Sequence, residues 1–322
     1  MMHSLPRVLT PVWLVAACGL AVATAGVAPA LPAAAASAAA ASSPTLAAAG
    51  DIIGDCTGSS CGYQKTAAVI TSLNPTTVLA LGDVSNRSGS ASDYTSRFNG
   101  SWGVFKAKIR PVPGNHDYGA PGAVNFFNYF GAAANPPRGY YSYDVGTWHI
   151  IAINSNCSEV GGCQAGSAQE KWLKNDLAQH PAACTLAFWH HPRYSSGVGG
   201  NNTSMKDIFQ DLYNARADVV LSSHSHDYER FARQNNAGQR DDANGIRQFV
   251  VGTGGSFFTS FGSIKPNSQA RNNNTFGVLK MTLGASSYSW KFVPVAGKTF
   301  TDSGATTCHH AALLTAGAVG QP

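Results

Sequence analysis

The amino-acid sequence predicts a single α/β domain in which helices cover a sheet, and three observations support this prediction. Short apolar runs rich in Val, Ile, Leu and Ala alternate with longer amphipathic stretches, as strands alternate with helices in an α/β fold. Each apolar run stops at Gly, Asp, Asn, His or Ser. With 44% hydrophobic and 12% charged residues, the chain can bury a core, and no internal repeat or clear boundary divides it.

Six apolar runs are the expected strands, because they are short and end in polar or turn residues. They comprise residues 45–53, 77–81, 148–154, 185–189, 218–222 and 248–251. The expected helices lie between these strands, at residues 63–72, 123–130, 168–179 and 204–215. Residues 278–283 and 288–293 are then expected to form a hairpin around Gly284, so the C-terminal part differs in character from the rest.

Composition and charge exclude several classes of protein. Neither a Gly-X-Y period nor a heptad period runs through the chain, which excludes collagen and coiled coil. Lys and Arg number 22 against 17 Asp and Glu, which gives a net charge of +5. No long basic run accompanies this excess, so the charge is too diffuse to predict a nucleic-acid-binding surface.

The first residues resemble an export signal. Arg7 supplies a positive start, residues 8–28 are apolar and uncharged, and Ala28-Pro29-Ala30 resembles an A-x-A cleavage site. A retained membrane anchor is one alternative, since the apolar stretch is nearly long enough to span a bilayer. Lipid attachment at Cys18, which ends a lipoprotein-like box, is the other. Cleavage predicts a secreted protein with no stable membrane partner.

These features divide the chain into four expected parts. A signal peptide at 1–30 is followed by an Ala-rich low-complexity linker at 31–44. The folded domain occupies 45–307, and a C-terminal tail occupies 308–322.

Cysteine usage agrees with export. The chain has seven Cys, and removal of the signal peptide takes Cys18 and leaves an even number, which fits disulfides in an oxidising compartment. One possible set of pairs is Cys56 with Cys61, Cys157 with Cys163, and Cys184 with Cys308. The first two would close small loops, and the third would tie the C-terminal region to the body. The sequence leaves other pairings open. A zinc site is the alternative use, but no C-x-x-C spacing supports it.

Polar residues gather where the expected strands end. Five ends carry Asp, Asn or His: Gly50-Asp51, Gly82-Asp83, Gly114-Asn115-His116-Asp117, His190-His191-Pro192 and His224-Ser225-His226. Because open α/β sheets bind ligands at the carboxyl ends of their strands, we expect these side chains to converge on one crevice. Two Asp, one Asn and three His are suitable ligands for two metal ions. A two-metal site activates water and binds an oxyanion, as hydrolysis of a phosphate ester requires.

Each motif has a simpler explanation when it is taken alone. Gly-Asp after a strand is usually a turn, and Asn-His-Asp can cap a helix. His-x-His in a loop is often incidental. The combination, in this order and at successive strand ends, is what indicates a metal centre.

The order of these motifs resembles the calcineurin-like metallophosphoesterase superfamily and, within it, the secreted purple-acid-phosphatase-like branch. The resemblance extends over about residues 45–307, which it identifies as a metallophosphoesterase catalytic domain. It implies a four-layer sandwich of two mixed β-sheets flanked by helices, with a dinuclear centre at the strand ends. The family-like stretches are Gly114-Asn115-His116-Asp117, Trp189-His190-His191-Pro192-Arg193-Tyr194 and His224-Ser225-His226-Asp227-Tyr228-Glu229-Arg230.

The resemblance also implies a role for each motif residue. His116 would be the acid that protonates the leaving alkoxide, with Asp117 orienting it. A hydroxide that bridges two metal ions (Fe, Zn or Mn) would attack phosphorus in line. The metal ligands would be Asp51 and His226 on the first ion, Asp83 bridging both ions, and Asn115, His190 and His224 on the second.

The sequence departs from the family pattern in three places. Many relatives have His two residues after the first Asp, where this chain has Ile53. Purple acid phosphatases have Tyr three residues after the bridging Asp, and their colour arises from that tyrosinate on ferric iron. This chain has Asn86 there, which offers a weak carbonyl oxygen unless water fills the position, and Tyr94 is the nearby substitute. We therefore expect a colourless protein. Ser223 replaces the Gly that usually precedes His-x-His.

The function that the sequence favours is hydrolysis of a small phosphorylated substrate, a phosphate monoester, by a secreted enzyme. A phosphodiesterase or nucleotidase with the same metals is one alternative. A non-catalytic secreted binding protein on a decayed scaffold is the other, and Ile53 and Asn86 are its support. His116 opposes it, because a binding protein would not need that acid. Arg193 and Tyr194 are candidates for contacts with the phosphate or the leaving group.

Overall fold

The computed structural model describes residues 10–14, 43–56 and 61–310. Residues 10–14 form no helix or strand and belong to a unit that ends at Ala41. The helices and strands of the described residues belong to the unit that begins at Ser42. The expected signal peptide, its alternatives at Cys18, and nearly all of the linker and tail lie outside the described residues. Within the described ranges, no helix has the length and apolar character needed to cross a bilayer.

The first sheet has six strands and contains both parallel and antiparallel pairs. Its order is β13-β12-β11-β1-β2-β3, in which β1, β2 and β3 are parallel and the others pair antiparallel. The strands are β1 (Thr45–Ala49), β2 (Thr77–Leu81), β3 (Ile109–Val112), β11 (Gly277–Leu283), β12 (Ser287–Pro294) and β13 (Ser303–Thr307).

The second sheet has seven strands in the order β10-β8-β9-β7-β6-β5-β4. Its centre is parallel, from β5 through β6 and β7 to β9, while β4, β8 and β10 pair antiparallel. The strands are β4 (Tyr141–Val145), β5 (Trp148–Ala152), β6 (Cys184–Phe188), β7 (Val219–Ser222), β8 (Tyr228–Phe231), β9 (Arg247–Val251) and β10 (Ser268–Asn272).

Four α-helices cover the outer faces, and short one-turn helices connect the remaining elements. The α-helices are α1 (Gly62–Leu73), α2 (Val124–Phe130), α3 (Ala168–Gln179) and α4 (Lys206–Asn214). The connections include a π-helix at Asp93–Phe98 and 3₁₀ turns at Trp102–Lys108, Asp117–Gly119, Pro121–Ala123, Gly131–Ala134, Cys157–Val160 and Thr203–Met205.

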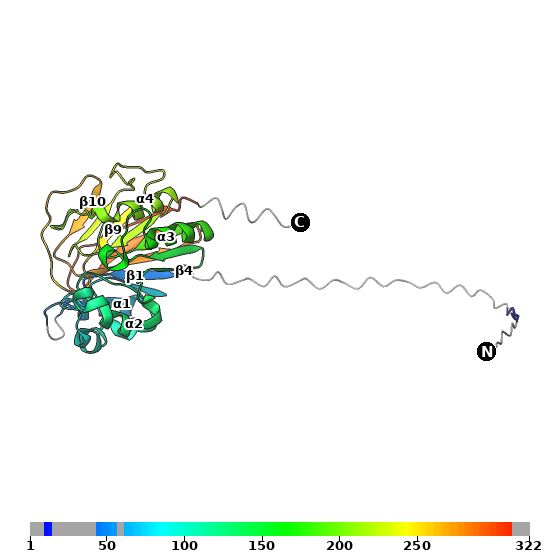
Figure 1. Cartoon of the computed structure of the whole chain (residues 1–322), viewed down its shortest axis with the longest axis horizontal. Helices are drawn as coiled ribbons and strands as arrows, with labels where there is room; N and C mark the ends of the chain where they lie inside the picture. Colours follow the sequence, from blue (N-terminus) through cyan, green and yellow to red (C-terminus); the bar gives the residue numbers. More distant parts are fainter. Residues whose placement is uncertain (1–9, 15–42, 57–60, 311–322) are drawn as a thin grey trace. The chain divides into compact units, whose positions relative to one another are not determined.

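The core follows from the alternation of side chains along the strands. In β5, Ile150 belongs to the large cluster that joins the two sheets with α1 and α2, whereas its neighbour Ile151 packs with α3 and α4 on the other face. Figure 1 shows α1 and α2 on the opposite side of β1 from α3 and α4. The arrangement is therefore the expected four-layer sandwich of two mixed sheets between helices.

The expected strands and helices are all present, with ends that differ by at most four residues. The largest difference is at β1, which ends at Ala49 rather than residue 53 because Asp51 adopts a left-handed φ of 56°. The polar run at Gly114 was expected at a strand end, and β3 is that strand, but its range was not among those expected. Five strands in all, including β3, lie outside the expected ranges. Of these, β3, β4, β10 and β13 are sheet edges, and β3 contains Pro111, which is tolerated there because an edge strand has one unpaired side.

Three disulfides confirm the pairs that the sequence left open. Cys56 bonds to Cys61 and Cys157 to Cys163, each closing a small loop. Cys184, at the start of β6, bonds to Cys308, so the first residue after the expected domain end is tied to the second sheet.

Candidate metal centre

The candidate ligands stand on loops that directly follow five parallel strands. Asp51 follows β1, Asp83 follows β2 and His224 follows β7, and their φ angles are 56°, 46° and 67°. A left-handed backbone is unfavourable for residues that carry a Cβ atom, and it persists where the surrounding structure imposes it, often at functional sites. Three of the six expected ligands therefore occupy strained positions that mark this edge of the sheets.

Glycines before the ligands let the strand ends approach closely. A Cβ atom at Gly114 would lie 2.1 Å from Oδ1 of Asp83, and one at Gly82 would lie 2.6 Å from Nδ1 of His190. Gly82 also has a φ of 87°, which glycine adopts without strain. A side chain at either position would displace a candidate ligand, so the Gly-Asp and Gly-Asn steps shape the site and are more than turns.

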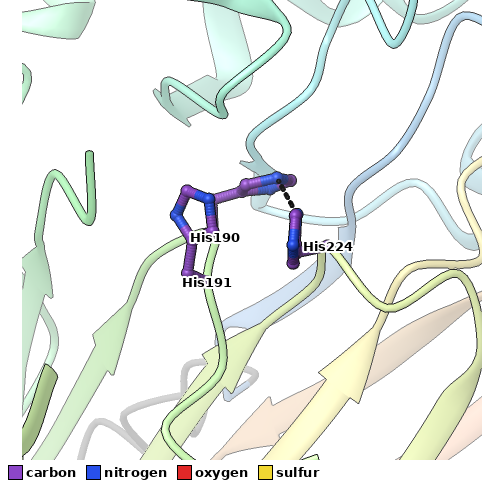
Figure 2. Close-up of side chains that lie close together, drawn as sticks. All are labelled: His190, His191 and His224. Carbon is purple, nitrogen blue, oxygen red and sulfur yellow. Dashed lines mark hydrogen bonds between the residues drawn. The ribbon is translucent and has the colours of Figure 1, made fainter. Parts of the chain in front are cut away.

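His190 is the fixed point of the second-metal half of the centre. Its Nδ1 lies 3.0 Å from the carbonyl oxygen of Leu81 and 2.9 Å from Oγ of Ser223. The Nε2 atom faces inward, 3.1 Å from Oδ1 of Asn115 and 3.2 Å from Oδ2 of Asp83. Nδ1 of His224 lies 3.2 Å from the same Nε2, which is the dashed contact in Figure 2. The sequence-predicted ligands of this half thus meet around one imidazole nitrogen.

The first-metal half is formed by Asp51, His226 and Asn86. Nε2 of His226 lies 3.3 Å from Oδ1 of Asp51, and its Nδ1 lies 3.0 Å from the carbonyl oxygen of Phe257. The other oxygen of Asp51 accepts a hydrogen bond from the backbone N–H of His224 at 2.8 Å. This bond links the two halves directly.

Asn86 lies inside the centre, with its amide nitrogen toward the ligands. Nδ2 lies 3.3 Å from Asp51, 2.9 Å from Asp83 and 3.3 Å from Nε2 of His226. The amide oxygen accepts a hydrogen bond from Oγ of Ser256 at 2.8 Å. In this orientation Asn86 is a donor to the carboxylates, and it would become an oxygen ligand only after its amide is reversed.

Burial and mutual contact set the charge balance of the centre. Asp51, Asp83 and His190 are fully buried. Burial acts to raise the pKa of Asp51, but His226, His190 and His224 outweigh it and lower that pKa to about 2. Burial acts to lower the pKa of His190, yet the carboxylates of Asp83 and Asp51 raise it to about 9. The buried carboxylates therefore attract positive charge strongly.

The donor set fits metal ions. In the described ranges, Asp51 and Asp83 form ion pairs with histidines alone, and buried carboxylates without Lys or Arg partners need a cation. The carbonyl contacts at Nδ1 of His190 and His226 leave each Nε2 available, as is usual for metal-binding His. Burial and His190 lower the pKa of His224 to about 4, which favours the neutral ring that a metal requires.

His116 lies at the exposed rim of the centre. Its side chain is 43% exposed, and Nε2 lies 4.0 Å from Oδ2 of Asp83. The backbone N–H donates to Oδ1 of Asp83 at 2.8 Å, and Nδ1 lies 3.2 Å from the carbonyl oxygen of Arg87. With Nδ1 held by that carbonyl, Nε2 is the atom that can exchange a proton with a substrate beside Asp83.

Asp117 requires a correction. We expected it to orient His116, but the hydrogen bond at Nδ1 of His116 within the described residues goes to Arg87. The buried Asp117 carboxylate instead accepts N–H bonds from Val84, Ser85 and Gly114, and burial together with Asp83 raises its pKa to about 6. It joins the loops after β2 and β3, because a side chain one residue away can project in another direction.

Tyr94 does not replace the missing tyrosine ligand. Its hydroxyl donates a hydrogen bond to Oδ1 of Asp117 at 2.5 Å, and burial raises the pKa of the phenol well above its ordinary value. Ile53, the other departure, is buried and makes an isolated parallel bridge with Ser85. Neither position supplies the ligand that relatives have there.

Two residues near the centre had been assigned no function from the sequence. Ser223, noted only as a departure, anchors His190 and donates to the carbonyl oxygen of Leu81 at 2.6 Å. The rings of His191 and His224 (Figure 2) have centroids 4.5 Å apart, and burial with His190 lowers the pKa of His191 to about 2.

The structure places Arg193 and Tyr194, the candidates for phosphate contacts, in the interior. Both side chains are buried and bond to Asn236.

Comparison with known proteins gives a consistent result. The family described as Calcineurin-like phosphoesterase matches residues 45–228, which include every candidate ligand. Purple acid phosphatase 22 of Arabidopsis thaliana is 35% identical over 36% of this chain and 27% of its own length. Purple acid phosphatase 15 of the same plant is 27% identical over 57% of this chain and 40% of its own length. The chain thus spans less than half the length of these relatives.

Solved structures confirm the fold. A purple acid phosphatase from yellow lupin (Lupinus luteus) seeds aligns with 83% of this chain and 54% of its own, with a TM-score of 0.69 and 19% identity. GAP50, described as the anchor in the inner membrane complex of Plasmodium, aligns with 87% of this chain and 96% of its own, with a TM-score of 0.61 and 16% identity. At these identities the likeness concerns the fold alone.

Proposed function

This chain belongs to the calcineurin-like phosphoesterase family, and we propose that it is a secreted enzyme that hydrolyses phosphate monoesters at a dinuclear metal centre. The observation that carries this proposal is the convergence of Asp, Asn and His side chains from five strand ends, where the two carboxylates are buried and pair with histidines rather than with Lys or Arg. The substrate class is a small phosphorylated molecule.

Each half of the centre would hold one metal ion. Bound there, two ions would lower the pKa of a water molecule, making it nucleophilic, and would neutralise negative charge on the phosphate. Asp83 would serve both halves, and this assignment is supported by the contacts of its Oδ2 with His190 on one side and Asn86 on the other. The remaining ligands would be Asp51 and His226 in the first half, and Asn115, His190 and His224 in the second.

His116 is the proposed general acid. Poor leaving groups need a proton on the departing oxygen as the P–O bond breaks, and Nε2 of His116 is exposed at the rim, beside Asp83. The carbonyl of Arg87 holds the other ring nitrogen, so Arg87 replaces Asp117 as the group that positions this ring.

The alternatives are a phosphodiesterase or nucleotidase at the same centre and a non-catalytic binding protein. The fold does not decide between catalysis and binding, since it is shared with a protein described as an anchor. The side chains favour catalysis, because both halves retain buried ligands and His116 is present at the rim. Three disulfides support export to an oxidising compartment.

The proposal can be tested by measuring turnover and metal content in the same sample. A phosphate monoester and diester with the same aryl leaving group would be compared before chelation, after chelation and after addition of Zn²⁺, Mn²⁺ or iron. We expect faster monoester hydrolysis, its loss on chelation and its recovery with metal, while circular dichroism shows an intact fold throughout. Full activity without metal would refute the mechanism, and a faster diester reaction would favour the diesterase. Inactivity of the metal-loaded protein on both would favour binding.

A further inference from the structure

A second cluster of His and Asp lies away from the candidate metal centre. His149 is the second residue of β5, Asp144 faces it across the antiparallel pair with β4, and Asp176 reaches it from α3. His180 directly follows α3. The candidate centre lies at the carboxyl ends of the parallel strands, whereas this cluster lies at the amino end of β5. The two sites are therefore at opposite ends of the strands of the second sheet.

His149 is held between two carboxylates. Its Nδ1 lies 2.7 Å from Oδ1 of Asp144, and its Nε2 lies 2.8 Å from Oδ2 of Asp176, while the side chain is 1% exposed. A neutral imidazole carries one N–H, so only one of these contacts can be a hydrogen bond from the neutral ring. At the other nitrogen a lone pair would face a carboxylate oxygen, so the pair needs a cation, which is either a proton in the hydrogen bond or a metal ion that both atoms bind side by side.

The same carboxylate also contacts His180. Nδ1 of His180 lies 2.9 Å from the backbone carbonyl oxygen of Asp176 and 3.3 Å from its Oδ1, so binding an ion through Nδ1 would require the ring to turn away from that carbonyl. Oδ1 of Asp176 also accepts a hydrogen bond from Oγ of Ser142 at 2.6 Å. The rings of His149 and His180 are stacked, with centroids 4.8 Å apart. One ligand atom from each of His149, Asp176 and His180 lies within 4.8 Å of the others. Three donors of the kinds that zinc prefers are therefore within reach of one ion.

We propose that His149, Asp176 and His180 bind a Zn²⁺ ion that is separate from the catalytic metals. Nε2 of His149 and a carboxylate oxygen of Asp176 would be two ligands, and His180 the third. Asp144 would accept the Nδ1 proton of His149, which fixes the tautomer with Nε2 available; this carboxylate–histidine–zinc arrangement is common in zinc proteins. The ion would join β4, β5 and the C-terminal end of α3.

The site has an entrance. A surface hollow of about 380 Å³ is lined by Asp144, Gly146, Thr147, Gln179 and His180, among others. The side chain of His180 is 44% exposed, so this ligand can reach an ion that arrives from solvent. The hollow also leaves room for water as a fourth ligand, as a site with three protein donors requires.

Protonation of His149 is the competing explanation. Burial acts to lower the pKa of His149, while Asp176 and Asp144 raise it above its ordinary value. A proton could then satisfy both carboxylates without metal. The two explanations differ in an observable way, because a proton needs only His149 and its two Asp partners, whereas the metal also needs His180.

The test is the number of zinc ions bound by the whole secreted protein and by His180→Ala. After dialysis against buffered Zn²⁺, His180→Ala should hold one ion fewer per chain than wild type, whatever the catalytic centre holds. Zn²⁺ should also raise the melting temperature of wild type more than that of the variant. Gln179→Ala, which changes the same hollow without removing a ligand, is the matched control and should behave as wild type. Phosphatase activity should be unchanged in both.

A second variant guards against an indirect effect of His180→Ala. Asp144→Asn leaves all three ligands in place and replaces the charged partner of Nδ1 with a neutral amide, so zinc affinity should fall by about 10- to 100-fold, the usual cost of altering such a partner. Equal zinc content and equal thermal shifts in wild type, His180→Ala and Asp144→Asn would overturn the proposal and leave protonated His149 as the explanation.

Discussion

The two halves of the candidate metal centre are built with different degrees of rigidity. In the second-metal half, His190 is fixed through Nδ1 by a main-chain carbonyl and by Ser223, and its Nε2 meets Asn115, Asp83 and His224. In the first-metal half, Nδ1 of His226 contacts the carbonyl oxygen of Phe257, a residue that is 56% exposed, and its backbone N–H donates to Oγ1 of Thr259. The first half also directs an amide N–H, rather than an oxygen, toward its carboxylates.

From this difference we expect the second half to matter more for activity, and the first half to determine which metal ion is bound. The second half has its donors in place and should bind its ion in one defined geometry. The first half lacks a tyrosinate and depends on reversal of the Asn86 amide or on water for an additional oxygen. It should therefore hold its ion more weakly and accept a divalent ion in preference to a trivalent one.

The largest expected effect is loss of the fixed ligand of the second half. His190→Ala should lower kcat/KM for a monoester by about 10⁴-fold, because stabilisation by a metal is worth several kcal/mol and each 1.36 kcal/mol is a factor of ten. One metal ion per chain should be lost. His310→Ala, whose ring lies near the carbonyl of Ala215 and away from the centre, is the control. Near-normal activity in His190→Ala would show that the second half is not needed.

The next largest effect is expected from His116, which lies at the rim of the centre and belongs to neither half. His116→Ala should slow esters with poor leaving groups by about 10²–10⁴-fold, the usual contribution of a general acid, and esters with good leaving groups far less. Metal content should hardly change, because His116 stands outside both ligand sets. An equal loss on both kinds of ester, or loss of metal, would make His116 a ligand or a structural residue.

A smaller effect is expected from Ser223, whose side chain fixes His190 in the second half. Ser223→Ala removes one of two contacts at Nδ1 of His190, so metal affinity or activity should fall by about 10- to 100-fold. Ser222→Ala is a matched control, since the neighbouring Ser222 hydroxyl bonds to the carbonyl of Phe249 and touches no ligand. If the two variants lost affinity equally, the rigidity assigned to the second half would be wrong.

The smallest effect on activity, and the clearest in the spectrum, concerns Asn86. Loaded with iron, the native protein should be colourless, because an amide cannot give the charge-transfer band of a tyrosinate on ferric iron. Asn86→Tyr should create a visible band. Tyr94→Phe should leave the spectrum unchanged, since the Tyr94 hydroxyl bonds to Asp117. A visible band in the pure native protein would contradict the weak first half.

The proximity of the candidate ligands was predictable in part from topology. Parallel strands of one sheet place their carboxyl ends together, so Asp51 could be expected beside Asp83, and His190 beside His224. The meeting of the two sheets' strand ends was implied by the order of the motifs, through the family resemblance. The direction of a side chain within a loop has no such rule. Asp117 follows His116 in the chain, yet its carboxylate binds the backbone of neighbouring loops. Ser223 looked like a neutral replacement, and only the structure shows that its hydroxyl bonds to the carbonyl oxygen of Leu81 at the end of β2.

Most of the strands that the sequence did not predict are edge strands, and their sequences explain why. In β13 (Ser303–Thr307), side chains alternate between exposed and half-buried, so the strand has no apolar run to detect. β3 contains Pro111, which the edge position accommodates; a strand end before Gly114 was expected, although the range of the strand was not. The interior strand β8 was also missed, because Glu229 and Arg230 interrupt its apolar pattern. The parallel strands between the edges bury both faces and are mostly apolar, which is why their positions were expected within four residues.

We propose that one cluster of strand-end residues holds two metal ions and hydrolyses phosphate monoesters. A crystal structure with anomalous scattering from the metals, taken from a sample whose turnover has been measured, would test this proposal directly. We expect two peaks that share Asp83, one beside Asp51 and His226 and the other beside Asn115, His190 and His224. An active sample with no anomalous peak among these residues would contradict it.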